Sequence, residues 1–459
     1  MKNILFFLLL LFFTEVTQAQ IKVTSISLNG NLKTQNDIIL RELSFEENEN
    51  YTQKDLTEKI KESKENLVNL KLFNFVEINK VVKDNTAQIT IDVIEKWYIW
   101  PYPVFEISER NFNTWWEEFS ANNYSDFSRL NYGMFFNWEN FRGRNELLQL
   151  KIRKGFKEHY LLAYKVPYFN KNKTLGVNTN LQFFRRQKTH YATENNQLQY
   201  FESDSYSSID YDLNTEIVYR NNIHQKHKLK FTYLSSIIAD SIATLNPNYL
   251  GSNNTTTNLF NISYLLEHEK RDYSIYPLHG YALNFTVKKY FSPSVDVQHF
   301  ELITKAEKHT EPFTRFYIGS SFKAKYSTDG KQPYFIQKAL GYTNYVRGYE
   351  YYVMDGKSYW LSKTAIKYAL IEKTNFDIPY VKMKQFNKAH YSLYLGVFSD
   401  LGYVRNDEAK GHNTLNNSLL WGKGIALDYV TYYDKLLRIE YSVNQLGEKG
   451  VFLHFSSPF

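Results

Sequence analysis

The sequence predicts a membrane β-barrel of about sixteen antiparallel strands, preceded by a small α+β domain. Aromatic residues make up 17% of the chain, with 38 Tyr and 34 Phe, while the mean hydropathy is only −0.49. From Trp97 onward, short runs of alternating polar and apolar residues recur between Asn-rich breaks. An export signal is followed by no second long apolar segment. A membrane barrel accounts for all three observations, because its apolar residues are hidden in alternation and it carries aromatic girdles.

Residues 1–19 have the pattern of a secretory signal peptide. Lys2 supplies a positive charge, Ile4 to Phe13 form an unbroken apolar run, and Ala19 offers a small residue for cleavage. Such a run is too short to cross a bilayer as a helix. The chain contains no cysteine, so we expect no disulfide, thiolate metal site or lipid-anchored cysteine. An exported chain of this kind is either soluble beyond the inner membrane or a barrel in the outer membrane.

Residues 20–96 are predicted to form a separate domain with the element order β-α-α-β-β. Thr34 is the expected N-cap of the first helix, with Asp37 as the acidic residue of its first turn. In the second helix, leucine and isoleucine residues recur at helical spacing. The expected elements are a strand over 21–28, helices over 34–43 and 52–70, and strands over 75–82 and 87–95.

Four short motifs accompany this order of elements. They are Asn29-Gly30-Asn31, Ile39-Leu40-Arg41-Glu42-Leu43, Leu72-Phe73-Asn74-Phe75-Val76 and Val93-Ile94-Glu95. Together they resemble a POTRA domain, a periplasmic module of outer-membrane assembly factors and two-partner secretion transporters. An unrelated small α+β domain is the alternative. An exposed strand edge in such a domain can bind an extended polypeptide by strand addition.

Residues 97–459 are predicted to form the barrel. Over 436–443, Leu437 and Ile439 lie on one face, while Arg438 and Glu440 lie on the other. Charged residues that alternate with large apolar residues are costly unless one face meets lipid and the other meets water. The same period of two recurs along the segment, for example over 175–183 and 211–219. Since each spanning strand needs about 9–11 residues, sixteen strands and their loops fit the available length.

The C-terminus has the pattern of a last barrel strand. Val451, Leu453, Phe455 and Phe459 share one face, and the chain ends on an aromatic residue. This resembles the terminal strand that outer-membrane barrels present to their assembly machinery. This ending agrees with the signal peptide and the alternating strands.

Two motifs in the C-terminal half predict a loop that folds into the barrel. Val346-Arg347-Gly348-Tyr349 lies in a turn-rich segment, 327–357, between two predicted strands. Phe398-Ser399-Asp400-Leu401-Gly402 lies within a later strand, and its alternation places Phe398, Asp400 and Gly402 on the inward face. We expect Arg347 and Asp400 to form a bidentate ion pair that anchors the loop. The alternative is that Arg347 is an ordinary solvated loop arginine.

These motifs resemble those of the outer-membrane assembly factor superfamily of the BamA and TamA type, which are bacterial surface antigen barrels. The resemblance implies that Val346 to Tyr349 form the tip of the sixth extracellular loop and that Asp400 lies on strand thirteen. Asp272-Tyr273, Pro277 and Gly280 resemble a further family stretch. One position departs from the family. Lys367 stands where strand twelve carries an acidic residue, and it would repel Arg347 unless it lies elsewhere or Asp400 is shared.

Prolines suggest a weak seam between the first and last strands. Pro101 and Pro103 are two residues apart, so both lack an N–H donor toward the same neighbouring strand. Pro458, next to the terminal Phe459, likewise removes a donor from the predicted last strand. In the superfamily that this chain resembles, the seam is the lateral gate for substrate strands. We expect the two prolines to face it, unless they lie in the linker before the barrel.

No motif in the sequence predicts an enzyme, a metal site or a cofactor. The histidines His159, His190, His268, His279 and His454 lack ligand spacing, and there is no HExxH, GxSxG or phosphate-binding glycine loop. The net charge of +7 is spread along the chain, so nucleic acid is not an expected partner. Unfolded polypeptides and the lipid bilayer are the expected partners, together with accessory periplasmic or lipoprotein subunits.

The resemblance implies a protein of the bacterial outer membrane with its POTRA domain in the periplasm. Its expected work is to insert outer-membrane proteins or to move polypeptides across the membrane. Two alternatives remain open at this point: a transporter dedicated to one secreted partner, and a passive channel or structural barrel.

Overall fold

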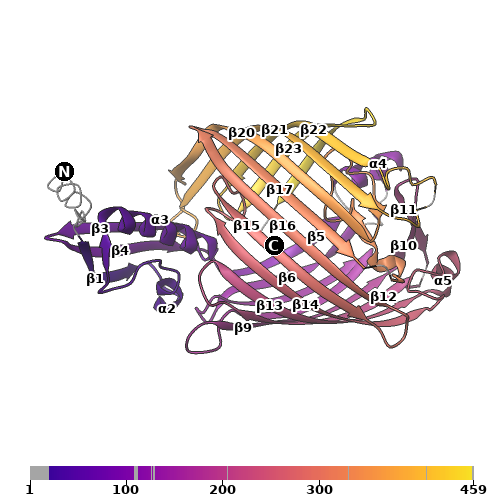
Figure 1. The fold of residues 1–459 in the computed structure, drawn as a ribbon, viewed down its shortest axis with the longest axis horizontal. Coiled ribbons are helices and arrows are strands. Elements are labelled where there is room, and N and C mark those ends of the chain that lie inside the picture. The colour runs from indigo at the N-terminus through magenta and orange to yellow at the C-terminus, as the bar shows by residue number, and fades with distance from the viewer. Residues whose placement is uncertain are drawn as a thin grey trace, which may run out of the picture. The chain divides into compact units, whose positions relative to one another are not determined.

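The computed structural model describes residues 20–107, 112–125, 127, 130–203, 205–328, 330–409 and 411–456. The chain divides into two compact units, 1–95 and 96–459 (Figure 1), one residue earlier than the predicted boundary. The predicted signal peptide and the C-terminal Pro458 and Phe459 lie outside the described residues.

The first unit is a four-stranded sheet with a helix packed on it. Its sheet has the order β2-β1-β4-β3, in which β1 and β4 are parallel and the other pairs are antiparallel. Val23, Ile39, Leu56, Leu67 and Ile91 are fully buried in its core. The elements are β1 (Gln20–Asn29), α2 (Asn36–Leu40), β2 (Asn50–Thr52), α3 (Gln53–Asn69), β3 (Phe73–Lys83) and β4 (Thr86–Glu95).

Thr34 does not cap the first helix, which corrects the sequence-based prediction. The N-cap of α2 is Gln35, whose side chain makes no capping hydrogen bond. The Thr34 hydroxyl instead donates to the Glu95 carboxylate at 2.6 Å, because the loop before α2 packs against the end of β4. Thr52 caps α3 by accepting from the Asp55 N–H. The three-residue strand β2 was missed, since so short a run has no detectable period.

The second unit is a single antiparallel sheet of 16 strands, which confirms the predicted fold class. Consecutive strands pair along the whole sheet (Figure 1), and hairpin or loop connections join them. The strands are β5 (Ile99–Ile107), β6 (Leu130–Phe141), β7 (Glu146–Gly155), β8 (Lys157–Val166), β9 (Leu175–Arg186), β12 (Ser208–Tyr219), β13 (Gln225–Ile238), β14 (Thr256–Arg271), β15 (Gly280–Phe291), β16 (Gln298–Phe313), β17 (Phe316–Ser327), β20 (Ser358–Asp377), β21 (Lys388–Arg405), β22 (Leu419–Thr431), β23 (Lys435–Asn444) and β24 (Lys449–Ser456).

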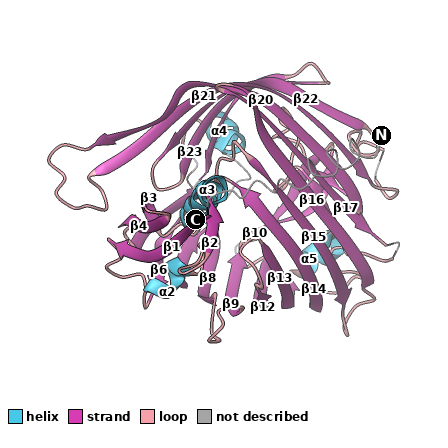
Figure 2. Cartoon of the chain, turned by 60° about the vertical axis from the view of Figure 1, so that its left-hand side comes forward, coloured by secondary structure: helices cyan, strands magenta, loops and turns pink. Residues whose placement is uncertain are grey.

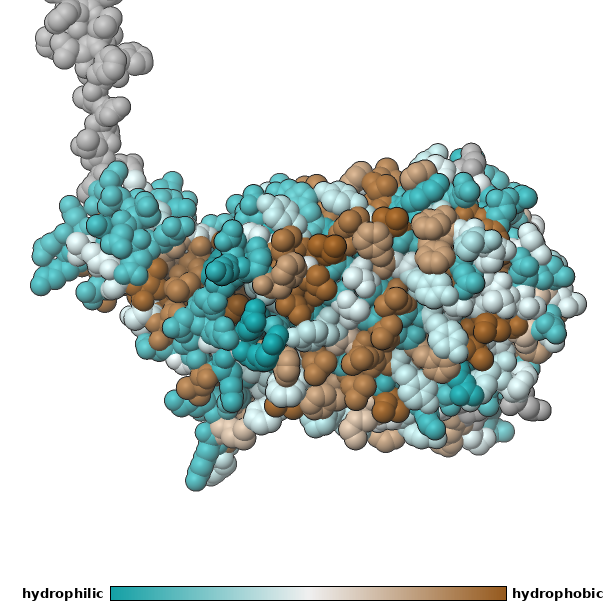
Figure 3. Space-filling model, turned by 90° about the horizontal axis from the view of Figure 1, so that it is seen from below, coloured by the Kyte–Doolittle hydropathy of each residue, from teal (hydrophilic) through white to brown (hydrophobic). Residues whose placement is uncertain are grey.

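The outer face of this sheet is apolar, as the alternation predicts. Leu395, Val397 and Leu401 on β21 are exposed, while the intervening residues of that strand point inward and are mostly buried. Apolar side chains are also spread over the face of the barrel unit that Figure 3 shows. A surface of this kind is stable against acyl chains. Among the described helices, none has the length and apolar character needed to cross a bilayer.

Connections at the two ends of the barrel differ in length. At the end where β5 finishes they include α4 (Phe112–Ala121), the hairpin β10 (Lys188–Glu194) with β11 (Gln197–Glu202), α5 (Asp240–Leu245) and the segment 328–357. In the barrel unit the described helical turns are confined to these connections, as the cyan segments α4 and α5 show in Figure 2. At the other end most connections are short turns, such as 142–145 and 432–434.

The sheet order begins at β24 and ends at β5. Within the described residues, no hydrogen-bonded pairing joins these two strands. The first and last strands therefore leave a seam, and we use this word for the facing edges of β5 and β24.

Candidate functional site

Residues 328 and 330–357, here called the in-folded loop, pack against the inner wall of the barrel. The loop contains the 3-10 turn η2 (Tyr334–Ile336) and a two-stranded ladder of β18 (Lys338–Leu340) and β19 (Met354–Asp355). Its apolar residues form a buried cluster with inward residues of β20, β21 and β22. The cluster is Ala339, Leu340, Val346, Tyr349, Met354, Tyr359, Leu361, Val404, Leu415 and Leu420. Hydrophobic burial therefore holds the loop inside the lumen.

Arg347, at the tip of this loop, forms a bidentate ion pair with Asp400 on β21. The guanidinium donates from Nη2 to Oδ1 at 2.6 Å and from Nε to Oδ2 at 2.8 Å. The Arg347 backbone N–H also donates to Oδ2 at 3.2 Å. Asp400 is fully buried and Arg347 is 6% exposed. A paired and hydrogen-bonded arrangement is what makes two buried charges tolerable.

Phe398 and Lys363 complete the surroundings of this pair. The Arg347 guanidinium lies 3.7 Å from the centre of the Phe398 ring, a stacked cation–π contact. Lys363, which pairs with Asp400 across β20 and β21, places its ammonium 3.8 Å from Oδ2. Asp400 is thus shared between two cations. Phe398, Asp400 and Gly402 occupy successive inward positions of β21.

Lys367 lies away from the Arg347–Asp400 pair. Its ammonium sits 3.8 Å from the centre of the Tyr276 ring, nearer the short-turn end of the lumen. This displacement weakens the repulsion between Lys367 and Arg347 that the sequence predicts, and the lysine beside Asp400 is Lys363. The strand-twelve position that departs from the family therefore serves a different contact in this chain.

Two inward glycines, Gly402 and Gly422, leave room for the loop tip at the barrel wall, and a third, Gly424, leaves room for the Phe398 ring. A Cβ at Gly422 would stand 1.7 Å from the Arg347 carbonyl oxygen, and one at Gly402 would stand 2.6 Å from Val346 Cγ2. A Cβ at Gly424 would stand 2.7 Å from the Phe398 ring. Gly422 and Gly424 were missed by the sequence reasoning. The signal was available, because glycines two apart in Trp421-Gly422-Lys423-Gly424 share one face of a strand.

The far side of the tip is bound by the end of β23 and the turn that follows it. Gly348 has a φ of +91°, a conformation that favours glycine, and its carbonyl accepts from Asn444 Nδ2 at 2.9 Å. The Tyr349 hydroxyl accepts from the Gln445 N–H at 3.3 Å, and the side chain is 1% exposed. The whole motif from Val346 to Tyr349 is thus fixed between β21, β22 and β23.

A second segment, 272–279 between β14 and β15, enters the lumen from the short-turn end. The Tyr276 hydroxyl donates to Asp428 Oδ2 at 2.7 Å, and Arg438 holds the same carboxylate through two bonds of 2.6 and 2.8 Å. Tyr273 donates to Asp434. This segment contains Asp272-Tyr273 and Pro277, the stretch for which the sequence suggested a family match. Both ends of the lumen therefore carry a segment tethered by carboxylates of the wall.

The lumen keeps a cavity of about 550 Å³ on the side opposite the Arg347 pair. Strands β8, β9, β12, β13 and β14 and the hairpin β10–β11 line the cavity, and Lys338 and Tyr342 of the in-folded loop cover it. Basic side chains outnumber acidic ones in its lining, with Lys157, Arg186, Lys188 and Lys338 against Asp210 and Asp212. The in-folded loop therefore fills part of the lumen and leaves this cavity beside it.

Pro101 and Pro103 lie within β5, so they are not part of a linker before the barrel. The Glu139 N–H donates to the Tyr98 carbonyl at 2.8 Å, which assigns the even-numbered residues of β5 to the hydrogen-bonded positions facing β6. The nitrogens of Pro101 and Pro103, at the alternate positions, therefore point to the seam. Both rings are exposed on the outer face. Pro458 and Phe459 lie beyond the described residues.

The second unit matches a family model over most of its length. Residues 140–445 match the model described as Omp85 superfamily domain, and residues 21–96 match a POTRA model described as surface antigen variable number repeat. No curated protein matches the chain.

Solved structures of outer-membrane barrels share the fold. BamA from Haemophilus ducreyi lacking POTRA domains 1–3 aligns with a TM-score of 0.53 at 15% identity, covering 95% of this chain and 83% of that one. CdiB from Escherichia coli aligns at 0.54 and 12% identity, covering 95% and 76%. CdiB from Acinetobacter baumannii aligns at 0.50 and 13% identity, covering 95% and 73%.

Proposed function

Because the chain belongs to the Omp85 superfamily, we propose that it inserts other β-barrel proteins into the outer membrane. The family acts in outer-membrane insertion or secretion, and the barrel lies in the bacterial outer membrane with the POTRA domain in the periplasm. Since β5 follows the POTRA domain, it starts at the periplasmic side. The in-folded loop therefore enters the lumen from the extracellular side.

The observation that carries the proposal is the seam. Within the described residues β5 and β24 have no pairing between them, and two prolines of β5 withhold donors from that edge. An unpaired edge is a template for another strand. A client strand can add to β24 or β5 by main-chain hydrogen bonds, so that its hairpins enter the bilayer beside the barrel.

The POTRA domain supports the same role. β3 is an outer strand of its sheet and has β4 as its neighbour within the described residues. Val81 on β3 is 67% exposed. Strand addition to β3 is how we propose that an unfolded client is received. A photo-reactive residue at Val81 should cross-link to client polypeptide, while the same residue at Lys54 on the exposed face of α3 should not.

A dedicated exporter for one secreted partner is the second candidate, favoured by the lumen cavity. An exporter needs a continuous passage, and the cavity of about 550 Å³ is a partial one that the in-folded loop interrupts. Release of the loop from Asp400 would be required to open it. A passive channel is disfavoured by the same loop and by the segment 272–279.

Depletion of the protein, followed by quantitative outer-membrane proteomics, separates these functions. An insertase should lower many barrel proteins together, and an exporter should lower one secreted cargo. Purified protein in liposomes should also speed the folding of a urea-denatured barrel. Loss of a single cargo with normal barrel levels would contradict the insertase proposal.

A further inference from the structure

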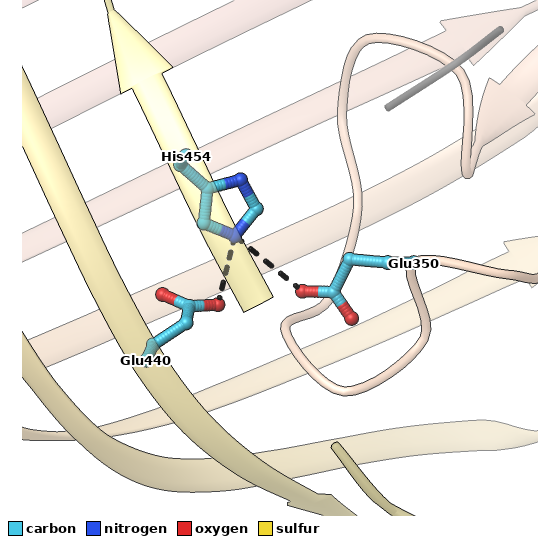
Figure 4. Close-up of side chains that lie close together, drawn as sticks. All are labelled: Glu350, Glu440 and His454. Atoms are coloured by element: carbon cyan, nitrogen blue, oxygen red, sulfur yellow. Dashed lines mark hydrogen bonds and ion pairs between the residues drawn. The ribbon is translucent and has the colours of Figure 1, made fainter. Parts of the chain in front are cut away.

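A histidine and two carboxylates meet in the lumen next to the loop anchor. Glu350 follows the tip motif directly, Glu440 lies on β23 and His454 lies on β24 (Figure 4). One ligand atom from each lies within 4.8 Å of the other two. His454 Nε2 is 3.2 Å from Glu440 Oε1 and 4.0 Å from Glu350 Oε1. Figure 4 shows both carboxyl groups turned toward the imidazole.

Burial makes this arrangement costly without a cation. Glu440 is 1% exposed and Glu350 is 3% exposed. Glu440 makes no ion pair with a lysine or arginine of the described residues, and its Oε2 has no hydrogen-bond partner among them. The nearby cations Arg347 and Lys363 are both paired with Asp400, and Arg438 is paired with Asp428. Two buried carboxylates this close repel each other unless one of them takes up a proton or a positive charge lies between them.

Hydrogen bonds orient two of the three groups toward a common point. The Gly348 N–H donates to Glu350 Oε2 at 2.8 Å, which leaves Oε1 directed at the histidine. The Tyr345 hydroxyl lies 3.3 Å from His454 Nδ1, so that Nε2 is left to face the carboxylates. Partners of this kind fix the ring orientation and tautomer of a metal-binding histidine.

We propose that Glu350, Glu440 and His454 bind a divalent transition-metal ion of the Zn²⁺ type. One imidazole nitrogen and two carboxylate oxygens suit Zn²⁺, whereas Ca²⁺ and Mg²⁺ take oxygen ligands. In a tetrahedral site with bonds of about 2.0–2.2 Å, ligand atoms stand about 3.3–3.6 Å apart. The 3.2 Å separation fits this value, and the 4.0 Å separation needs only a small side-chain movement. A water molecule would complete the four-coordinate site.

The ion would join the in-folded loop to the two last strands. Glu350 is three residues from Arg347, and His454 lies on the strand that borders the seam. Two ring contacts already bring the loop to β24, Tyr345 with His454 and Tyr351 with Phe452. A bound ion would hold β24 to the loop, and its removal would release that strand.

Zn²⁺ alone, titrated into the chelator-treated full chain in detergent and without a histidine tag, tests this site. We expect one ion per chain. The double variant Glu440→Gln with His454→Gln should lose that stoichiometric binding, while His279→Gln should keep it. His279 lies 3.5 Å from Glu311 and belongs to no three-residue cluster among the described residues, so it is a matched control.

Two further measurements keep the test independent of misfolding. Tyr345→Phe leaves all three ligands in place but removes the bond to His454, and should weaken Zn²⁺ binding about 10–100-fold. Co²⁺ in the wild-type protein should give intense tetrahedral d–d bands without a thiolate charge-transfer band, since the chain has no cysteine. Absence of stoichiometric Zn²⁺ binding to the wild type, or its survival in the double variant, would overturn the proposal. Neither result depends on client insertion.

Discussion

Gly422 on β22 faces the carbonyl oxygen of Arg347 so closely that a Cβ at Gly422 would stand 1.7 Å from it. The barrel wall therefore fits the loop tip in shape, in addition to offering the Asp400 carboxylate to the Arg347 guanidinium. Asp400 lies opposite Gly422 in the β21–β22 ladder, so the carboxylate and the space for the arginine backbone are adjacent. The ion pair and the hollow both act on Arg347, and the hollow also accommodates Val346.

The first prediction concerns this hollow. Gly422→Ala should displace the loop tip or bend β22, because backbone atoms cannot yield as a flexible side chain does. Overpacking of this kind costs about 1–3 kcal/mol or more. Protease cleavage within 328–357 should rise, measured on the folded protein in detergent. Gly411→Ala is the control, since nothing lies within 4 Å of a Cβ there. Equal protection of both variants would show that the close fit is unimportant.

The second prediction concerns the ion pair itself. Arg347→Ala leaves Asp400 buried without its bidentate partner, which should cost about 3–5 kcal/mol. Because Lys363 remains near Asp400 in this variant, the cost should lie near the lower end of this range, about 3 kcal/mol. Less heat-modifiable barrel and faster cleavage of the loop are the expected readouts. Arg405→Ala, at an exposed ion pair with Asp407, should change neither.

A double variant distinguishes a lost pair from a lost side chain. Arg347→Ala with Asp400→Ala removes both charges, so it should be more stable than Arg347→Ala alone. Arg347→Lys should fall between wild type and Ala, because an ammonium cannot form the two parallel bonds. Strict additivity of the two single losses would contradict a direct coupling.

Much of this fold was open to prediction from the sequence, for a physical reason. A strand that meets lipid on one side and water on the other must alternate between apolar and polar residues. The polarity of residues such as Leu395, Val397 and Asp400 therefore indicates which face of the strand each one lies on. The strand count and the inward face of β21 follow from that period. The POTRA elements were predicted from order and spacing in the same way.

What escaped prediction depends on contacts between distant segments. Lys367 was considered as a neighbour of Arg347, but the ring that its ammonium contacts, that of Tyr276, comes from a turn that no period describes. Thr34 has the right type for a cap, yet the tertiary contact with Glu95 takes precedence. The His454 cluster joins residues 14 and 104 positions apart in sequence, so no ligand spacing could reveal it.

The third prediction concerns the segment that enters from the periplasmic side. Tyr276→Ala removes a ring that packs 5.0 Å from Tyr394 and a bond to Asp428. Ion conductance of the purified protein in a planar bilayer should rise, because this side chain occupies the lumen. Tyr276→Phe should lose about 0.5–1.5 kcal/mol of stability but keep the lumen filled. Tyr380→Ala, at a fully exposed position of the turn 378–387, is the control. Unchanged conductance in Tyr276→Ala would argue against a plug at this end.

The fourth prediction is a pH dependence at the extracellular hairpin β10–β11. Burial, together with the positive charges of Lys338, Arg186 and Lys157, lowers the pKa of His190 to about 3. Its ring lies against Tyr334 and Tyr342 of the in-folded loop. A lowered pKa favours the neutral ring, so its contribution to stability is complete above the unfolded value of about 6.5 and is lost as pH falls toward 3.

Acidification should therefore loosen the hairpin from the loop. Protease cleavage of β10–β11 should increase between about pH 6.5 and pH 4 in the wild type. His190→Gln, which does not titrate, should flatten that profile, and His412→Gln, at an exposed position of a neighbouring loop, should leave it unchanged. An unaltered profile in His190→Gln would assign the pH dependence to other groups.

The fifth prediction concerns the seam. Pro101→Ala with Pro103→Ala would place two N–H donors on the edge of β5 that faces β24. Each new hydrogen bond across the seam should add about 0.5–1.5 kcal/mol to its closure. If client strands enter there, tighter closure should slow the folding of a urea-denatured barrel in liposomes while raising the urea midpoint of the protein itself. Pro167→Ala, in a turn between β8 and β9, is the control for the loss of proline rigidity. A variant that is more stable and also inserts clients faster would place the entry site away from this seam.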